Sequence, residues 1–312
     1  MNVLSLCDGM SCGQIALKEC GITIDKYFAA EIKEIGIEVT KANFPSTIFI
    51  GDVNKISYKN GVLYTENGEY PCEIDLVMFG SPCQTFSVCM KKELRNGLKN
   101  KEKSGLFLEC HRILQEVNPK WFFIENVASM KKEDRNTLSG IIGREPYNID
   151  AADFSPCHRK RLYWTNIPFT LKDKSNITLN DILCTGYSPR QKGTCLLVSD
   201  ARPLRDPIKM FFRYEKHSIT NLIFIDEKHY LHCKEYYYSK YSKQTAAKDL
   251  DVTDPDNKVF NGLRYLSQEE LEKVQGVPTG YTKCLTRNQA ADVLGDGWQI
   301  DVIKMFFNNL KG

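Results

Sequence analysis

Short apolar runs alternate with segments of helical periodicity over about the first 170 residues of the chain. Helices are predicted over Gln14 to Cys20, which ends at Gly21, and over Leu106 to Val117. The apolar runs are rich in β-branched and aromatic residues and predict strands at Val3 to Leu6, Tyr27 to Ala30, Thr47 to Ile50, Asp75 to Phe79 and Trp121 to Ile124. This alternation is typical of an α/β domain with a largely parallel sheet.

The pattern changes after about residue 170 to polar turns, tyrosines and irregular strands. Tyr236, Tyr237 and Tyr238 are interpreted there as strand core, with packing against a ligand as the alternative. Helical periodicity returns over Ser267 to Val274, which starts with a capping box, and over 289–310, which we expect to dock on the first domain. The predicted division is a domain of residues 1–175 plus 285–312 and a smaller, irregular domain of residues 176–284.

Length and composition exclude a disordered chain, because 312 residues with 42% hydrophobic content can bury a sizeable core. No apolar run approaches the roughly 18 residues that span a bilayer, and the start of the chain has no export signal. We therefore expect a cytoplasmic protein without a membrane partner. The 12 cysteines are scattered and are interpreted as reduced thiols. His229, His232 and Cys233 lack a fourth ligand, so no metal is expected.

Two segments are strongly basic although the net charge is only +3. Residues 186–248 hold 12 Lys/Arg against 6 Asp/Glu, and residues 91–103 hold 6 against 2. Both segments are candidates for contacts with a phosphate backbone. The alternative for either one alone is a solvated surface.

The residues that follow the first three predicted strands suit an adenosine-type cofactor. Asp8 to Gly13 forms a glycine-containing turn at a helix N-terminus, where backbone can approach a ligand. Glu31 follows the second strand and suits ribose hydroxyls, and Asp52-Val53 follows the third and suits an adenine amino group. The alternative is an ordinary strand-to-helix turn, since the segment is neither a dinucleotide fingerprint nor a phosphate-binding loop.

The later strand ends carry a nucleophile and its candidate partners. Cys83 follows the fourth strand after Gly80-Ser81-Pro82 and precedes the basic segment, an arrangement that favours a thiolate. Glu125 follows an apolar strand and is a candidate proton carrier, with a helix cap as the alternative. Arg159 and Arg161 point to the same side if extended and suit a carbonyl or a phosphate, with a basic surface strand as the alternative.

The ordered set of motifs resembles the DNA cytosine-5 methyltransferase family, especially its short phage and prokaryotic enzymes and the catalytic domain of its de novo class. Two positions depart from the family pattern: the last motif, usually Gly-Asn-Ser-Val, reads Gly295-Asp296-Gly297-Trp298, and Cys157 stands where Gln is common. The matching motifs are Asp8 to Gly13, Glu31, Asp52-Val53, Gly80 to Gln84, Ser104 to Phe107, Glu125 to Val127, Arg159-x-Arg161, Arg264 to Glu270 and Gln275 to Pro278.

The resemblance implies a Rossmann-like S-adenosylmethionine-dependent methyltransferase domain, a target-recognition domain and double-stranded DNA as partner. It implies a Cys83 nucleophile that adds to cytosine, with Glu125, Arg159 and Arg161 holding the base. The implied cofactor contacts are Asp8, Gly9, Met10, Ser11, Cys12, Gly13, Glu31, Ile32, Asp52, Val53, Gly80, Pro82, Leu106, Asp296, Gly297 and Trp298. The implied DNA contacts are Ser81, Gln84, Ser87, Lys91, Lys92, Arg95 and Lys99.

Three alternatives stay open or are disfavoured on the residues themselves. A tRNA cytosine-5 methyltransferase would use the same chemistry and is the runner-up. A regulatory relative without activity is expected to lose the Cys or the Glu, whereas Cys83 and Glu125 are both present. An adenine amino-methyltransferase would carry Asp/Asn-Pro-Pro-aromatic at the fourth strand, where Ser81-Pro82-Cys83-Gln84 stands. We expect a stand-alone monomer from a phage or a prokaryote, and restriction-modification, marking of a phage genome and regulation of transcription all stay open as its role.

Overall fold

The protein is described by a computed structural model over residues 1–81, 105–217 and 219–310. The chain forms two compact units. Unit 1 comprises Met1–Ala151, Lys160–Asp173 and Gly297–Gly312, and unit 2 comprises Ala152–Arg159 and Lys174–Asp296.

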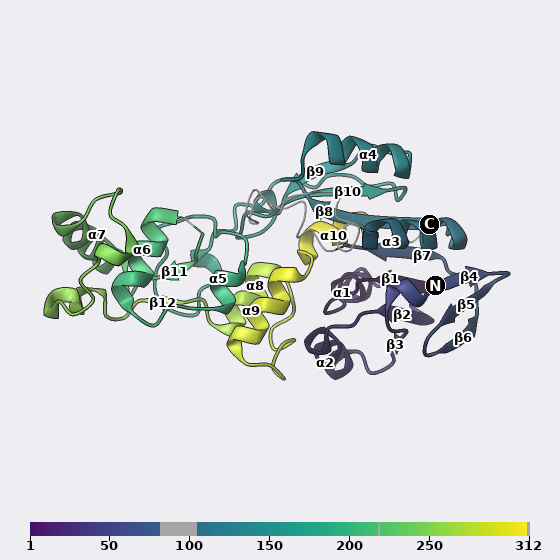
Figure 1. The fold of residues 1–312 in the computed structure, drawn as a ribbon, viewed down its shortest axis with the longest axis horizontal. Helices are drawn as coiled ribbons and strands as arrows, with labels where there is room; N and C mark the ends of the chain where they lie inside the picture. The colour runs from purple at the N-terminus through teal and green to yellow at the C-terminus, as the bar shows by residue number, and fades with distance from the viewer. Residues whose placement is uncertain (82–104, 218, 311–312) are drawn as a thin grey trace. The chain divides into compact units, whose positions relative to one another are not determined.

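Unit 1 is built on a seven-stranded sheet in the order β3-β2-β1-β7-β8-β10-β9 (Figure 1). The first five strands in this order are parallel, and β10 is antiparallel to both of its neighbours. The strands are β1 (Asn2–Leu6), β2 (Lys26–Ala30), β3 (Ile48–Phe49), β7 (Leu76–Phe79), β8 (Trp121–Val127), β9 (Tyr147–Asp150) and β10 (Lys160–Thr165). The predicted α/β class with a mostly parallel sheet is confirmed.

The central strands are continuous apolar runs because helices cover both faces of the sheet. On β7, Val77 and Phe79 belong to the core cluster that includes α3 residues, whereas Met78 reaches Gly13 of α1 on the other face. Helices α1 and α10 contact each other, and Phe306 of α10 packs on Phe123 of β8. The helices of unit 1 are α1 (Cys12–Glu19), α2 (Glu34–Asn43), α3 (Gly105–Val117), α4 (Lys132–Ile142) and α10 (Ile300–Phe307).

A three-stranded antiparallel meander interrupts this alternation between β3 and β7. It consists of β4 (Ser57–Lys59), β5 (Val62–Thr65) and β6 (Gly68–Pro71) and follows the short 3-10 helix η1 (Val53–Lys55). Asn60 and Gly61 both have positive φ, 52° and 77°, as a tight type I′ hairpin turn requires. Leu63 of β5 is buried in the core cluster of the main sheet, so the meander is anchored to unit 1.

Unit 2 is largely helical and has a core of its own. Its helices are α5 (Val198–Ala201), α6 (Pro207–His217), α7 (Glu227–Lys240), α8 (Gln268–Gln275) and α9 (Arg287–Asp296). Aromatic residues of α6, α7 and the 3-10 helix before β12 (Arg264–Tyr265) contribute to the core, and β12 pairs with β11 (Leu222–Ile223). Short 3-10 helices lie at Ala151–Asp153, Asn180–Ile182, Ala247–Asp249 and Pro255–Phe260.

Two details of the second half differ from the expectation. Tyr236, Tyr237 and Tyr238 lie on α7, so the expected strand there is wrong, although Tyr237 is indeed buried core. The segment 289–310 is divided between two helices, and only α10 belongs to unit 1. Helix α9 packs on α5 and α8 within unit 2, and the change of unit therefore comes between Asp296 and Gly297 rather than at residue 285.

Candidate active site

The predicted cofactor and nucleophile motifs follow β1 and β7, which are adjacent parallel strands. The chain leaves β1 for β2 on one side of this pair, while β7 and β8 continue on the other side. This is the point where the strand order reverses, and open α/β sheets bind ligands there, beyond the carboxyl ends of the strands. Leu6 and Phe79 are paired at those ends, so the Asp8 turn and Gly80-Ser81 emerge side by side.

The turn after β1 is held from within by Asp8. Its half-buried carboxylate accepts hydrogen bonds from the Tyr27 hydroxyl (2.7 Å) and from the Ser11 hydroxyl, and Thr40 donates to Ser11 Oγ at 3.2 Å. Burial raises the pKa of the Asp8 carboxyl above its usual value, against the lowering effect of these hydrogen bonds. Asp8 thus stabilises the turn through these hydrogen bonds.

Gly9 has open space beside it in the turn. Its φ is +63°, and a Cβ built on it would meet nothing within 4 Å. Gly13, by contrast, is closely packed, because a Cβ on it would stand 2.4 Å from Met78 Cε and would force Met78 to move. Met10 and Cys12 are buried, so the free space of the turn lies over Gly9.

Glu31 follows β2 and connects the two strand ends. Its Oε2 accepts a hydrogen bond from Gly9 N at 2.7 Å, and its Oε1 accepts from Ile32 N and Lys33 N at 2.8 Å each. Ile32 exposes 69% of its surface beside this carboxylate. A carboxylate with spare acceptor capacity next to an exposed apolar side chain suits a ribose hydroxyl and an adjoining base.

Asp52 and Val53 follow β3, as the sequence predicted. Asp52 caps η1, where its Oδ1 accepts hydrogen bonds from Asn54 N (2.9 Å) and Asn54 Nδ2 (2.8 Å). Its own N–H donates to Oε1 of Glu66 at 2.9 Å. Glu66 was not predicted from the sequence, and it reaches this turn from the hairpin between β5 and β6.

Glu125 and Arg161 are brought together on the antiparallel strands β8 and β10. Arg161 Nε lies 2.8 Å from Glu125 Oε1, and the two side chains are only 15% and 11% exposed. An ion pair removed from water is both stronger and more ordered than a surface pair. Two of the predicted base-binding residues are therefore joined in one ion pair.

Trp298 lies against the end of β7, next to this ion pair. A Cβ built on Gly80 would stand 2.5 Å from Trp298 Nε1 and 3.0 Å from Glu125 Oε2. The backbone N–H of Trp298 donates to Cys12 Sγ at 3.3 Å, which ties the residue to the turn after β1. A second contact holds the segment after β7: Asn126 Nδ2, on the neighbouring strand β8, donates to Ser81 Oγ at 3.2 Å.

Other predicted residues lie elsewhere. Arg159 belongs to unit 2, where its buried guanidinium donates to the Gly295 carbonyl and to Cys195 Sγ, each at 3.2 Å. Asp296 is the exposed last residue of α9 in the same unit, whereas buried Gly297 begins the last segment of unit 1. The expectation that Arg159 and Arg161 serve one base stays a prediction.

The remaining predicted residues divide into two groups. Leu106 is half-buried in the first turn of α3 and packs on the core of unit 1. The others lie outside the described residues: Pro82, Cys83, Gln84, Ser87, Lys91, Lys92, Arg95 and Lys99.

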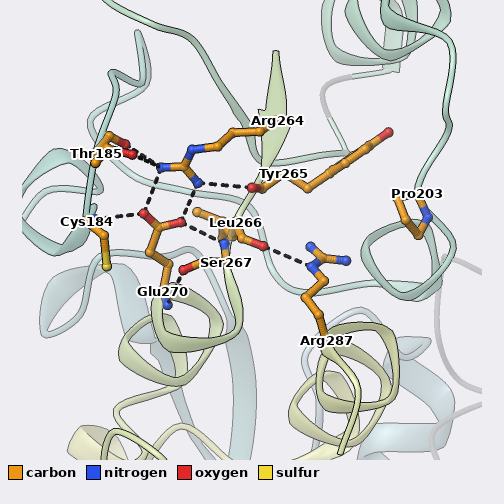
Figure 2. Close-up of a pocket in the computed structure, with 9 residues that line it drawn as sticks. All are labelled: Cys184, Thr185, Pro203, Arg264, Tyr265, Leu266, Ser267, Glu270 and Arg287. Atoms are coloured by element: carbon orange, nitrogen blue, oxygen red, sulfur yellow. Dashed lines mark hydrogen bonds and ion pairs between the residues drawn. The ribbon is translucent and has the colours of Figure 1, made fainter. Parts of the chain in front are cut away.

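The Arg264 to Glu270 motif forms a clasp in unit 2 (Figure 2). The fully buried Glu270 carboxylate accepts hydrogen bonds from Arg264 Nη1 at 2.7 Å and Nη2 at 2.9 Å, and from the backbone N–H of Ser267 and Cys184 at 2.8 Å each. The clasp lines a pocket of about 510 Å³ together with Pro203, Tyr265 and Arg287. It joins the start of α8 to the loop at Cys184, so this motif organises unit 2.

The first part of the chain is similar to a known protein family. A model of the family described as C-5 cytosine-specific DNA methylase matches residues 1–146. The predicted resemblance to the DNA cytosine-5 methyltransferase family is borne out over these residues, which make up just under half of the chain. The matched part contains the turns after β1, β2, β3 and β7 as well as Glu125.

Curated relatives match parts of the chain. The type II methyltransferase M.NgoBV of Neisseria gonorrhoeae is 30% identical over 194 residues, which cover 57% of this chain and 41% of that protein. The orphan methyltransferase M.SPRI of Bacillus phage SPR is 28% identical over 298 residues, covering 86% and 62%. The chain thus spans from about two fifths to about three fifths of these two relatives.

Solved structures share the fold over nearly the whole chain. The Dnmt2 methyltransferase of S. pombe aligns with a TM-score of 0.65 at 15% identity, covering 98% of this chain and 96% of that one. The methyltransferase EhMeth of Entamoeba histolytica aligns with a TM-score of 0.64 at 17% identity, covering 100% and 99%. In the described part of the chain, no helix is long and apolar enough to cross a bilayer, and no three metal-ligand side chains gather at one point.

Proposed function

We propose that this protein is a DNA cytosine-5 methyltransferase that transfers a methyl group from S-adenosylmethionine to C5 of a cytosine in duplex DNA. The observation that carries the proposal is the Glu125–Arg161 ion pair of 2.8 Å at the end of β8. Strand β8 lies next to β7, and the chain that leaves β7 reaches Cys83 four residues after Phe79. An acid and a guanidinium thus lie on β8 and β10, the next two strands of the sheet after β7, and the sequence has a thiol shortly after β7, the three groups that addition to a pyrimidine ring requires.

The residues after β1, β2 and β3 fit S-adenosylmethionine. The open space over Gly9 would admit the part of the cofactor that lies along the turn. Glu31 would accept the ribose hydroxyls, exposed Ile32 would cover one face of the adenine, and Asp52 would accept from its amino group. When bound there, the cofactor supplies an electrophilic methyl group.

The chain's own residues would activate the base. Attack of the Cys83 thiolate on C6 forms a carbon–sulfur bond and moves the C5–C6 electron pair to C5, which becomes nucleophilic. Glu125 would hold a proton at N3, where charge develops, and Arg161 would hold the O2 side. After methylation, C5 loses its proton to a base and the carbon–sulfur bond breaks, which frees the thiolate and leaves 5-methylcytosine.

The DNA must present a base outside its stack, because a thiol cannot reach C6 within a duplex. Unit 2, with the basic segment 186–248, is proposed to choose the site, and Arg159 to serve the same base from unit 2. The basic segment 91–103 is proposed to contact phosphates. Type II and phage enzymes among the relatives support a role in restriction-modification or in marking a phage genome.

The test is transfer of a labelled methyl group from S-adenosylmethionine to mixed-sequence duplex DNA and, separately, to total tRNA, followed by nucleoside analysis. The proposal predicts 5-methylcytosine in DNA. Label confined to tRNA would keep the chemistry and replace the substrate. No label in either nucleic acid would contradict the proposal.

A further inference from the structure

The meander between η1 and β7 reaches back to the turn that we assign to the adenine of the cofactor. Glu66 stands between β5 and β6, and its two carboxylate oxygens have different partners. Oε1 accepts a hydrogen bond from Asp52 N at 2.9 Å, and Oε2 lies 2.5 Å from Lys55 Nζ. One side chain therefore bridges both ends of the Asp52–Lys55 segment.

The neighbouring residue extends the same contact to the strand. Asn67 Nδ2 donates to the carbonyl of Phe49, the last residue of β3, at 3.0 Å. Gly51 lies between these contacts with a φ of +79°, and a Cβ there would stand 2.0 Å from Glu66 Oε1. The carboxylate thus packs so closely on the turn that a side chain at position 51 would displace Glu66.

The hairpin that carries Glu66 is itself held by the core. Leu63 is fully buried in it, and the Tyr70 ring lies 5.2 Å from the Phe28 ring, measured between centroids. Tyr58 N donates to Glu116 of α3 at 2.9 Å. Because the base of the meander is anchored, the position of Glu66 is set by the fold of unit 1.

Asp52 is left with one carboxylate oxygen for a ligand. Its Oδ1 is taken by the two Asn54 donors, and Oδ2 accepts no hydrogen bond from the described residues. The direction of Oδ2 depends on the backbone at Asp52, and that backbone is held by Glu66. The hydrogen bond to Lys55 also lowers the pKa of the Glu66 carboxyl, so Glu66 remains an ionised acceptor at neutral pH.

We propose that Glu66 is a positioning residue that fixes the Asp52–Val53 turn for recognition of the adenine amino group of the cofactor. The inference rests on the proposed function. It adds that selectivity for adenine depends on a hairpin outside the strand-to-helix turns of the sheet.

The experiment measures binding of S-adenosylhomocysteine and of S-inosylhomocysteine to the full chain by isothermal titration calorimetry. The inosine analogue carries an oxygen where adenine has its amino group, so the ratio of the two affinities reports on the contact with Asp52. Glu66→Ala removes both acceptors, whereas Glu66→Gln keeps one oxygen for Asp52 N. Glu69→Ala, an exposed glutamate on β6, is the matched control.

Glu66→Ala is expected to weaken S-adenosylhomocysteine binding about five-fold, the size of one hydrogen bond, and to reduce the preference for adenine by a similar factor. Glu66→Gln and Glu69→Ala should stay within about two-fold of wild type. The inference is overturned if Glu66→Ala binds both ligands as wild type does. It is also overturned if Glu66→Ala loses affinity for both equally while its Tm falls, which is the signature of a role in folding alone. If wild type binds neither ligand, the cofactor site itself is wrong, and the role of Glu66 falls with it.

Discussion

Gly80 lies against the indole of Trp298, so that the end of β7 and the segment before α10 meet at a position without a side chain. A methyl group on Gly80 would stand 2.5 Å from Trp298 Nε1 and 3.0 Å from Glu125 Oε2. The contact under 3 Å forces Trp298 to move, the contact of 3.0 Å crowds Glu125, and both neighbours belong to the candidate active site. The absence of a side chain at position 80 thus keeps Trp298 and Glu125 in place.

Gly80→Ala is expected to lower methyl transfer at least about ten-fold, because overpacking of roughly 1–3 kcal/mol displaces Trp298 or Glu125. Labelled-methyl transfer and thermal unfolding by circular dichroism are the measurements. Gly140→Ala is the matched control, since a Cβ there meets nothing within 4 Å on α4. That control should keep activity and gain up to about 1 kcal/mol in the free energy of unfolding. Equal activity of Gly80→Ala and wild type would show that the contact at Gly80 does not matter.

Substitutions of Glu125 and of Arg161 are expected to have different effects on activity and on stability. Glu125→Gln keeps the shape but cannot supply the proton for N3, so the turnover number kcat should fall at least about 100-fold while the fold is retained. Arg161→Ala leaves a largely buried carboxylate without this partner, so both activity and Tm should fall. Arg144→Ala, on the exposed loop after α4, should change neither quantity. Wild-type turnover in Glu125→Gln would remove Glu125 from the chemistry.

Asp200 in α5 of unit 2 predicts a pH dependence of stability. Burial raises the pKa of its carboxyl to about 6, against lowering contributions from Leu197 N and Arg287. A raised pKa in the folded state means that stability is lost as pH rises from the unfolded value of 3.8 through about 6. The loss is about 2–3 kcal/mol in the free energy of unfolding. Asp200→Asn should abolish it.

Urea unfolding at pH 4.5, 5.5 and 7.0 measures this effect. The advantage of Asp200→Asn over wild type should grow with pH over this range. Asp292→Asn, at an exposed position of α9, should follow wild type. An Asp200→Asn protein with the pH slope of wild type would contradict the assignment.

The Glu270 clasp predicts the opposite pH dependence. Burial alone would raise the pKa of Glu270, but the hydrogen bonds from Arg264, Ser267 and Cys184 outweigh it and lower the pKa below its usual value. The clasp therefore stabilises unit 2 above pH 4.5, and this contribution is lost as pH falls further. Glu270→Ala leaves the Arg264 charge without its partner and should cost about 3–5 kcal/mol at pH 7.

Unfolding of Glu270→Ala in urea, followed by circular dichroism, tests the clasp. Exchange of Glu269, which forms an exposed i,i+4 pair with Lys273, should cost less than about 1 kcal/mol. If Glu269→Ala and Glu270→Ala are equally destabilised, the clasp does not organise unit 2.

The strands of unit 1 could be predicted because a strand buried on both faces must be apolar along its whole length. Leu76–Phe79 and Trp121 to Ile124 are such runs; Gly80-Ser81 follows the first, whereas β8 continues past the second to Val127 and so contains Glu125 rather than ending before it. The capping box at Ser267 was equally local and was confirmed. These features depend on residues that are close together in the sequence, so the pattern of the sequence predicts them directly.

Some features that were not predicted have a clear signal in the sequence, and others have none. The Asn60-Gly61 pair is a strong hairpin signal, and Ile208, Phe211 and Phe212 have the i, i+3, i+4 spacing of a helix. Tyr236 to Tyr238 favour a strand by composition, and tertiary packing of Tyr237 on Phe211 and of Tyr236 on Phe260 overrides that preference. The contacts of Glu66 with Asp52, and of Arg159 with Gly295, join residues distant in sequence and leave no periodic signal.

The most direct test of the central claim is covalent trapping of Cys83 on duplex DNA that contains 5-fluorocytosine, in the presence of S-adenosylmethionine. Fluorine at C5 cannot leave as a proton does, so the carbon–sulfur bond formed by Cys83 should persist. The account predicts a denaturation-resistant protein–DNA complex, with the methyl group incorporated and the link mapped to Cys83 by peptide mass spectrometry. Cys83→Ser should give no such complex. Continued methyl transfer by Cys83→Ser, or a wild-type enzyme that methylates ordinary DNA without ever being trapped, would contradict the account.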